Sequence, residues 1–226
     1  MTRKEKKFGV VSPKAKAETS SDEISSNVDI SELNKSIPPL EVIQEAMEVD
    51  TPGEVNSEGY YIVVDTNILM TDLNFLDELK DQTLQGRGPP NIVIPWVVVA
   101  ELDGLKGNRS QTQGCTGWEN QRKAIKAIKY IYAILRKKHP RVRGQSLKEA
   151  QQTVPNLTPT CNDDKVLQCC LQLWERVPKD QVVLLSNDKN LLNKALINNV
   201  EAHTRESFEK TFRVEFSVPK VIGTSK

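Results

Sequence analysis

The sequence predicts a single α/β domain in which a central parallel sheet is covered by helices on both faces, as a three-layer sandwich. Three short apolar runs, at residues 60–64, 92–94 and 181–185, are typical of fully buried strands. Segments with helical spacing of apolar residues lie between these runs, and strands that alternate with helices form parallel sheets. Ligands of such sheets bind beyond the carboxyl ends of the strands, so the residues that follow each run are candidates for a functional site.

The first third of the domain reads as strand, helix, loop, strand and helix. Residues 60–64 are β-branched and apolar, and leucines at near-helical spacing over 69–79 predict a helix. The glycines and prolines of 86–90 predict a loop before the second strand. Pro95 is suited to the first turn of a helix that we expect from Trp96 to about Lys106.

A long basic helix is the main element of the middle of the domain. Gly104 to Gly117 is polar and predicts a flexible loop. Residues 118–138 predict a helix with apolar residues inward and basic residues outward. We expect Trp118, at its start, to pack in the core rather than to stack on a base. Residues 139–161 contain three prolines and predict a further loop.

The last third repeats the strand and helix pattern. A helix is predicted to open at 162–165, with Asn162 as its N-cap and two aspartates in its first turn. The third strand, 181–185, precedes a helix from Asp188 to about Asn198. Residues 200–203 suit an edge strand, and a short helix follows from Arg205.

Composition divides the chain into a tail and a folded part. Residues 1–58 are rich in Ser, Glu, Pro and Lys and predict a disordered acidic tail, 59–218 predict the folded domain, and 219–226 predict a frayed terminus. Residues 1–59 carry 7 Lys+Arg and 12 Asp+Glu, whereas residues 60–226 carry 24 and 18. Residues 104–159 hold 12 basic residues and two acidic ones, which indicates either a polyanionic partner or a solvated helix face.

Several classes of protein are excluded by motifs that the sequence lacks. No apolar run approaches the roughly 18 residues of a membrane helix, and no apolar stretch follows the basic N-terminus as in a secretory signal. The four cysteines form no Cys-x-x-Cys pair and suit buried thiols in a reducing compartment. No phosphate-binding loop occurs, and Gly86-Arg-Gly88 stops short of a dinucleotide motif, so no nucleotide cofactor is expected. A haloacid-dehalogenase-type phosphatase would have Asp-x-Asp after the first strand, where this chain has Asp65-Thr66-Asn67.

Four acidic positions lie near the predicted carboxyl edge of the sheet. They are Asp65, Glu101, Asp188 and either Asp164 or its neighbour Asp163. Each alone has a structural explanation as a cap, a turn former or a surface residue, but carboxylates gathered in one pocket repel one another unless a cation neutralises them. Oxygen ligands suit Mg²⁺ or Mn²⁺, and one or two such ions support phosphodiester cleavage. Neighbouring polar side chains either orient the carboxylates or cap turns: Thr66, Asn67, Ser186 and Asn187.

Four segments resemble, in order and spacing, the motifs of PIN-domain nucleases. They are Val-Val-Asp-Thr-Asn (63–67), Pro-Trp-Val-Val-Val-Ala-Glu-Leu-Asp (95–103), Asn-Asp-Asp-Lys-Val-Leu (162–167) and Leu-Leu-Ser-Asn-Asp-Lys-Asn-Leu (184–191). The resemblance spans roughly residues 60–212 and is strongest to the eukaryotic Swt-type branch, nuclear endoribonucleases linked to transcription and to surveillance of messenger RNA. It implies a PIN-like, Rossmann-like sandwich in which Asp65, Glu101, Asp164 and Asp188 are catalytic metal ligands, with Asp163 as a supporting residue.

The resemblance further implies cleavage of single-stranded RNA with Mg²⁺ or Mn²⁺. Swt-type proteins are longer than this chain, so we expect it to represent a segment or short form. Phosphate contacts are expected from Lys106, Arg109, Arg122, Lys123, Lys126 and Lys129, with little base specificity. The expected location is nuclear, including the nuclear periphery, and also cytoplasmic, with nuclear protein partners for the tail. Two alternatives stay open: a catalytically silent RNA-binding or scaffold module, and a structure-specific DNA nuclease.

Overall fold

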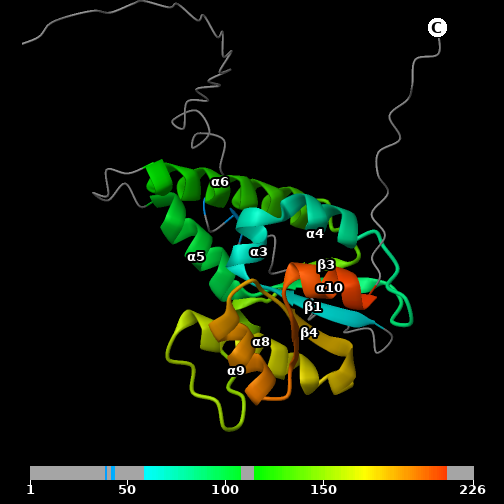
Figure 1. Cartoon of the computed structure of the whole chain (residues 1–226). Coiled ribbons are helices and arrows are strands. Elements are labelled where there is room, and N and C mark those ends of the chain that lie inside the picture. Colours follow the sequence, from blue (N-terminus) through cyan, green and yellow to red (C-terminus); the bar gives the residue numbers. More distant parts are fainter. Residues whose placement is uncertain (1–38, 40–41, 44–58, 108–114, 213–226) are drawn as a thin grey trace, which may run out of the picture.

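The fold contains a five-stranded, fully parallel sheet with helices on both faces (Figure 1). The computed structural model describes residues 39, 42–43, 59–107 and 115–212. It confirms the predicted α/β class and its three layers. The strands lie in the order β3-β2-β1-β4-β5. Their bounds are β1 Tyr60–Val64, β2 Pro90–Ile94, β3 Val142–Gly144, β4 Val182–Leu185 and β5 Glu201–His203.

Helices connect each strand to the next. Figure 1 shows α3, α4 and α6 over one face of the sheet and α8 and α9 over the other. Their bounds are α3 Thr66–Thr71, α4 Leu73–Leu79, α5 Trp96–Gly107, α6 Cys115–Arg136, α7 Leu147–Ala150, α8 Asn162–Trp174, α9 Lys189–Ile197 and α10 Arg205–Phe212, with a short 3₁₀ turn at Lys179–Gln181. The first predicted helix is therefore two helices, because the backbone leaves helical geometry at Asp72.

Three element predictions need correction. The loop expected over 139–161 contains the edge strand β3 and the short helix α7. β3 escaped prediction because Val142 is the only aliphatic side chain of its three residues. The loop expected from Gly104 to Gly117 overlaps the end of α5 and the start of α6. At α8 the N-cap is Cys161, and Asn162 is the first helical residue.

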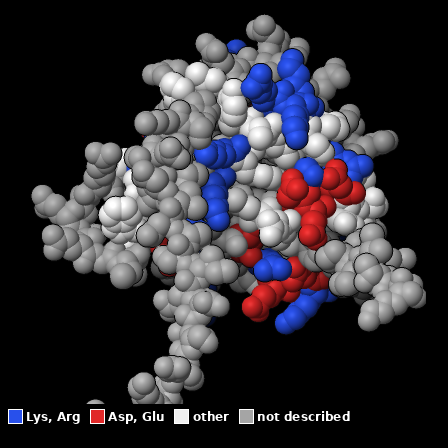
Figure 2. Space-filling model, turned by 90° about the horizontal axis from the view of Figure 1, so that it is seen from above, with Lys and Arg blue, Asp and Glu red and all other residues white. Residues whose placement is uncertain are grey.

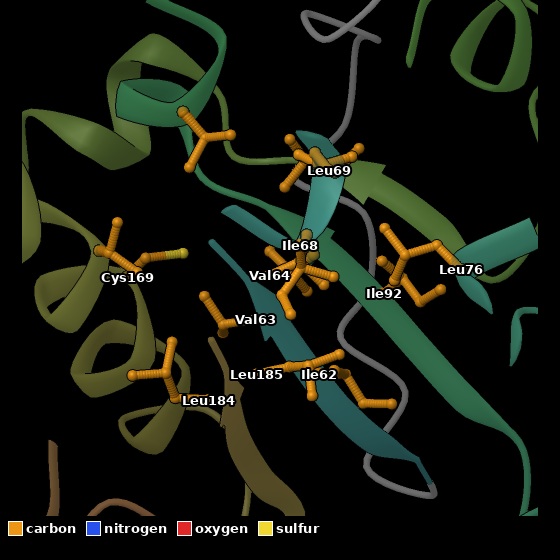
Figure 3. Close-up of a cluster of buried hydrophobic side chains, with 14 of the residues drawn as sticks. Ile62, Val63, Val64, Ile68, Leu69, Leu76, Ile92, Cys169, Leu184 and Leu185 are labelled. Atoms are coloured by element: carbon orange, nitrogen blue, oxygen red, sulfur yellow. The ribbon is translucent and has the colours of Figure 1, made fainter. Parts of the chain in front are cut away.

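The core fills both sides of the sheet. All five residues of β1 and all four of β4 are buried, which explains why these strands are continuous apolar runs. Figure 3 shows Val63 and Leu184 on the side of the sheet occupied by Cys169 of α8. Ile62 and Ile92 lie on the opposite side, with Leu76 of α4 (Figure 3). The alternation follows from the two-residue period of a strand, whose successive side chains point to opposite faces.

The strand order creates a switch point between β1 and β4. From β1 the chain moves outward through β2 to β3, and it then crosses back to place β4 and β5 on the other side of β1. Ligands of open α/β sheets commonly bind near such a point, beyond the carboxyl ends of the central strands. Asp65 follows β1 and Ser186 follows β4, so both residues lie at the carboxyl ends of these two strands.

Both predicted terminal regions lie almost entirely outside the described residues. This applies to most of the tail, 1–58, and to the frayed end, 219–226. Of the tail, Pro39, Val42 and Ile43 are described, and Ile43 is buried in the main hydrophobic cluster. Within the part of the chain that the structure describes, no helix has the length and apolar character needed to span a bilayer.

Candidate metal and active site

Asp65 is the most enclosed of the predicted acids. It caps α3 and is 7% exposed. Its Oδ1 accepts a hydrogen bond from the Thr66 N–H at 2.7 Å. Its Oδ2 accepts from the Ser186 hydroxyl at 2.8 Å and from the Asn67 side-chain amide at 3.2 Å. Every one of these donors is neutral, so the negative charge is solvated by dipoles and not by a cation.

Two further acids are linked to Asp65 through Thr66 and Ser186. The Thr66 hydroxyl donates to Glu101 Oε2 at 2.7 Å, which ties α5 to the start of α3. The Asp188 N–H donates to the Ser186 Oγ at 2.9 Å, and the Asp188 carboxylate caps α9 by accepting from Asn190 and Leu191. The structure therefore links the Asp65 and Glu101 carboxylates and the backbone of Asp188 in one hydrogen-bonded network at the switch point.

Asp163 and Asp164 belong to a second network. Lys194 of α9 donates to Asp164 Oδ1 at 2.9 Å and to Asp163 Oδ2 at 3.3 Å. Asp164 Oδ2 accepts from the backbone and hydroxyl of Thr160 and from the Cys161 N–H, so this carboxylate closes a capping box on α8. The described contacts join these acids to the helix that Asp188 begins, but not to Asp65.

Opposite pKa shifts distinguish the two networks. Burial raises the pKa of Asp65 above its ordinary value, although hydrogen bonds from Ser186, Thr66 and Asn67 partly offset that effect. The Lys194 ammonium and the Thr160 N–H lower the pKa of Asp164. Among the described residues no Lys, Arg or His forms an ion pair with Asp65, Glu101 or Asp188. Among the described side chains, Lys194 therefore pairs with the acids of the second network, and no basic group pairs with those of the first.

The first network has the donor chemistry of a hard divalent ion, although its side chains are not gathered into a ready-made cage. Asp65, Glu101 and Asp188 offer carboxylate oxygens, which are the ligands of Mg²⁺ and Mn²⁺. Among the described side chains, no group of three His, Cys, Asp or Glu is close enough to hold a metal ion. The buried carboxylate of Asp65 without a cationic partner nevertheless fits such an ion, because an uncompensated buried charge is costly.

Of the four polar side chains predicted beside the acids, three contact them and one does not. Thr66, Asn67 and Ser186 contact the acids as predicted. Asn187 instead contacts Asp72 and the backbone N–H of Arg205, beside a hollow of about 300 Å³ on the β5 side of the rim. Sequence reasoning missed Lys194, whose only local signal is a basic residue between the buried Leu191 and Ala195 of α9.

Basic residues recur along α6 and form the basic row of this helix: Arg122, Lys123, Lys126, Lys129 and Arg136. Figure 2 shows the Lys and Arg side chains of the face seen from above in several patches, some of them beside Asp and Glu side chains. Of the predicted RNA contacts, Lys106 pairs with Asp103 and Lys123 pairs with Glu119. Within the described residues Arg122, Lys126 and Lys129 have no ion-pair partner, and Arg109 lies outside those residues. Trp118 is 63% exposed, so the prediction that it packs in the core is wrong.

The fold and the acidic rim define a class of protein. The family model described as PIN domain matches residues 62–206, and the chain belongs to this family. PIN domains are generally nucleases that bind RNA and use Mg²⁺ or Mn²⁺, and some are inactive. The match confirms the predicted resemblance.

Curated relatives extend the comparison. The chain is 37% identical over 169 residues to the human transcriptional protein SWT1, covering 71% of this chain and 18% of that protein. It is 34% identical over 146 residues to the Saccharomyces cerevisiae protein of that name, covering 61% and 30%. Zebrafish telomerase-binding protein EST1A is 28% identical over 192 residues, covering 74% of this chain and 12% of that protein. The chain thus spans about a fifth to a third of its SWT1 relatives. The PIN domain of human SMG5 aligns over 67% of this chain and 97% of that domain, with 22% identity and a TM-score of 0.39.

Proposed function

We propose that the chain is a divalent-metal-dependent endoribonuclease that cleaves single-stranded RNA at the carboxyl edge of its sheet. The observation that carries this proposal is the Asp65 network. A buried carboxylate is held by neutral donors only, and Thr66 and Ser186 link it to Glu101 and Asp188. The network stands at the switch point, where ligands of open parallel sheets bind.

In this proposal Asp65, Glu101 and Asp188 hold one or two Mg²⁺ or Mn²⁺ ions. A bound ion supplies charge to the phosphate and makes water a better nucleophile. Thr66 and Ser186 fix the rotamers of the acids, as supporting residues of metal ligands commonly do. Asn67 donates to Asp65 and keeps one of its oxygens oriented. Asp164, with Asp163 beside it, completes the acidic edge once Lys194 is displaced or turned.

RNA reaches the acids along the basic row of α6. Arg122, Lys126 and Lys129 are without ion-pair partners among the described residues, so contact with phosphate breaks no existing pair. Lys106, Lys123 and Arg109 extend the same proposed surface. Such contacts position a strand without reading its sequence.

One observation favours a second candidate function, a catalytically silent RNA-binding module. Lys194 already neutralises Asp163 and Asp164, and the described side chains include no three-membered metal cluster. A protein that keeps the fold and the basic helix but leaves these acids occupied would bind RNA without turnover.

The deciding experiment incubates single-stranded and covalently closed circular RNA with the full chain in Mn²⁺ or in EDTA. Cuts in the circle that need Mn²⁺ and disappear in Asp65→Asn support the endonuclease. RNA binding without cuts identifies the silent module, and equal cutting of a matched DNA strand identifies a DNA nuclease.

Three variants serve as comparisons in that experiment. Asp77→Asn replaces an exposed aspartate of α4 that pairs with Lys80, so we expect it to cut RNA as the parent does. Asp163→Asn and Asp164→Asn identify which of the two acids contributes. The assay runs well below the melting temperature, because losing the capping box at Asp164 costs roughly 1 kcal/mol of stability.

The cellular setting is proposed from the relatives. Similarity to transcriptional proteins supports a nuclear location, including the nuclear periphery, and a part in messenger-RNA quality control, with further molecules in the cytoplasm. We assign the folded unit to 59–218 and contacts with nuclear proteins to the tail, 1–58.

A further inference from the structure

A hollow of about 160 Å³ lies on the β3 side of the rim. Its lining includes Trp96 at the start of α5, Gln145 directly after β3, Leu147 and Ala150 of α7, and Lys165 and Gln168 of α8. These residues come from three stretches of the chain: 96–97 and 145–151 follow the carboxyl ends of β2 and β3, and 165–168 lie in the first turns of α8. The hollow is therefore part of the edge at which the acids gather.

The walls of this hollow are fixed by hydrogen bonds. Gln145 is 2% exposed, accepts from the Trp96 N–H at 3.0 Å and donates to the Gln172 side chain at 2.7 Å. Gln172 in turn donates to the backbone carbonyl groups of Glu149 and Gln152. The side-chain amides of the wall are thus already held by hydrogen bonds in the free protein. Binding of a ligand would therefore cost little conformational entropy at these side chains.

Ion pairs of Glu149 hold α7, one of the helices that line the hollow. The Glu149 carboxylate pairs with Arg143 at 3.1 Å and with Arg176 at 2.6 Å, and it closes the capping box of α7 with Ser146. Burial raises the pKa of Glu149, but the two arginines and the Ser146 N–H outweigh that effect and lower it overall. The carboxylate is therefore ionised at neutral pH, and the helix that carries Leu147 and Ala150 is fastened on both sides.

The hollow adjoins the proposed site of cleavage. Trp96 and Val97 begin the helix that carries Glu101, which lies one turn after Val97 on α5. Lys165 follows Asp164 directly at the start of α8. A strand with one phosphate at the acids would therefore bring a neighbouring nucleotide to the mouth of the hollow.

The lining suits a flat aromatic ring. Trp96 and the aliphatic side chains provide apolar walls, and unpaired bases in protein complexes stack on such aromatic groups. An engineered cavity of about 150 Å³ in another protein accommodates benzene, so the volume here admits the ring of a base. The Gln168 amide N–H already donates to the Gln152 carbonyl, so the Gln168 side-chain oxygen and the exposed Lys165 are the groups that we assign to the edge of the base and to the phosphate that follows it.

We propose that this hollow binds one unpaired nucleobase of the RNA strand, with Trp96 as its stacking surface. This inference takes RNA as the ligand from the proposed function. It also gives a physical reason why the protein would act on single-stranded RNA. A base inside a duplex is paired and stacked, and it cannot enter a pocket without leaving the helix.

The test measures binding in EDTA, so it does not depend on cleavage. The probes are a short strand of base-free ribose phosphates and the same strand with one base restored. The parent protein should bind the second strand about tenfold more tightly, the effect of one stacked base. Ala150→Leu fills the hollow and should abolish this gain. Ala150→Ser leaves the volume open and should keep it.

Trp96 provides a second pair of variants. Trp96→Phe should retain most of the gain and Trp96→Leu should lose it, with melting temperatures recorded to confirm folding. Equal binding of the two strands by the parent, or an undiminished gain in Ala150→Leu, overturns the pocket assignment. If the protein binds the base-containing strand more tightly but never cuts RNA, the pocket assignment holds and the proposed nuclease function is wrong. If it cuts RNA but binds both strands equally, the nuclease function holds and the pocket assignment is wrong.

Discussion

At the scale of single residues, the buried carboxylate of Asp65 is expected to reduce stability. Its raised pKa means that the folded state disfavours the charged form, because burial removes water from the carboxylate. Asp65→Asn removes this charge, so we expect the metal-free variant to be more stable than the parent by on the order of 1 kcal/mol at pH 7. Urea unfolding in EDTA measures the difference.

The same shift fixes the direction of the pH dependence. A carboxyl with a raised folded pKa binds its proton more readily when folded, so the parent gains stability relative to Asp65→Asn as the pH falls through that pKa. The advantage of the variant should therefore shrink in acid. Asp77→Asn removes an exposed carboxylate, so this variant should not be more stable than the parent at pH 7. A variant less stable than the parent at pH 7 would mean that the hydrogen bonds to Asp65 outweigh its desolvation.

Residue positions close to strand ends were predictable, and distant pairings were not. Asp65, Thr66 and Ser186 stand directly after strands, and the two-residue period together with the carboxyl-edge rule places them at one rim. Lys194 reaches acids that precede it by about thirty residues, across two packed helices. Only the packing of α8 against α9 sets that pair, and no local pattern encodes it. Trp118 was wrongly predicted to be buried because its apolar side chain suggests packing. The sequence does not show whether the core extends as far as the start of α6.

At the scale of elements, the two faces of α6 differ in burial and in charge. Its inward residues Ile125, Ile128 and Ile131 are buried, whereas Arg122 and Lys126 are exposed. If this outer face binds phosphates, replacing Arg122, Lys126 and Lys129 with Gln should lower the slope of log affinity against log salt. Each lost contact with a single strand removes about 0.7 from the slope, so the triple variant should lose about 2.

A control triple at the opposite edge sharpens this measurement. Lys137 and Lys138 follow α6 before β3, and Lys179 precedes β4, so all three lie near the amino ends of strands. Their replacement by Gln removes the same charge without touching the proposed surface, and the slope should stay unchanged. Equal losses in both triples would mean that net charge, and not the α6 surface, drives binding.

Elements with many apolar residues were predicted well, and those without were not. The continuous apolar runs of β1, β2 and β4 predict strands that are buried on both faces. β3 is an edge strand with two polar or glycine residues, and α7 has four residues. Both are stabilised by tertiary contacts, chiefly pairing with β2 and the ion pairs of Glu149, which a local pattern does not reveal.

At the scale of the whole molecule, chain topology is what assembles the site. The hydrogen bond from Ser186 to Asp65 joins residues 121 positions apart, and it exists because β4 pairs with β1 and not with β3. Alternating strands and helices predict a parallel sheet, but the return across β1 depends on how the helices pack. The sequence thus predicts the class of fold and the edge at which Asp65 and Ser186 meet, whereas the strand order is a property of the folded molecule.

The last helix of the described residues, α10, tests where the cooperative unit ends. The family match stops at residue 206, yet Phe208 is fully buried. Its ring meets Phe75 of α4 at 6.2 Å and Phe212 at 4.5 Å between centroids, and Phe212 meets Tyr60 of β1 at 5.3 Å. These contacts tie α10 to both the first strand and the first helical layer, so the helix should unfold together with the sheet.

Phe208→Ala should therefore destabilise the entire domain by about 3–5 kcal/mol, the cost of emptying a buried aromatic site. Denaturant unfolding followed by circular dichroism and by tryptophan fluorescence measures the loss, and the two probes should report a single coincident transition. Ile197→Ala, at a side chain 80% exposed on α9, should change stability by less than about 0.5 kcal/mol. If Phe208→Ala matched that control, or if the two probes separated, α10 would be an appendage and the folded unit would end near the family boundary. If both probes report the same loss of stability, the aromatic cluster of α10 stabilises β1, the strand that Asp65 directly follows.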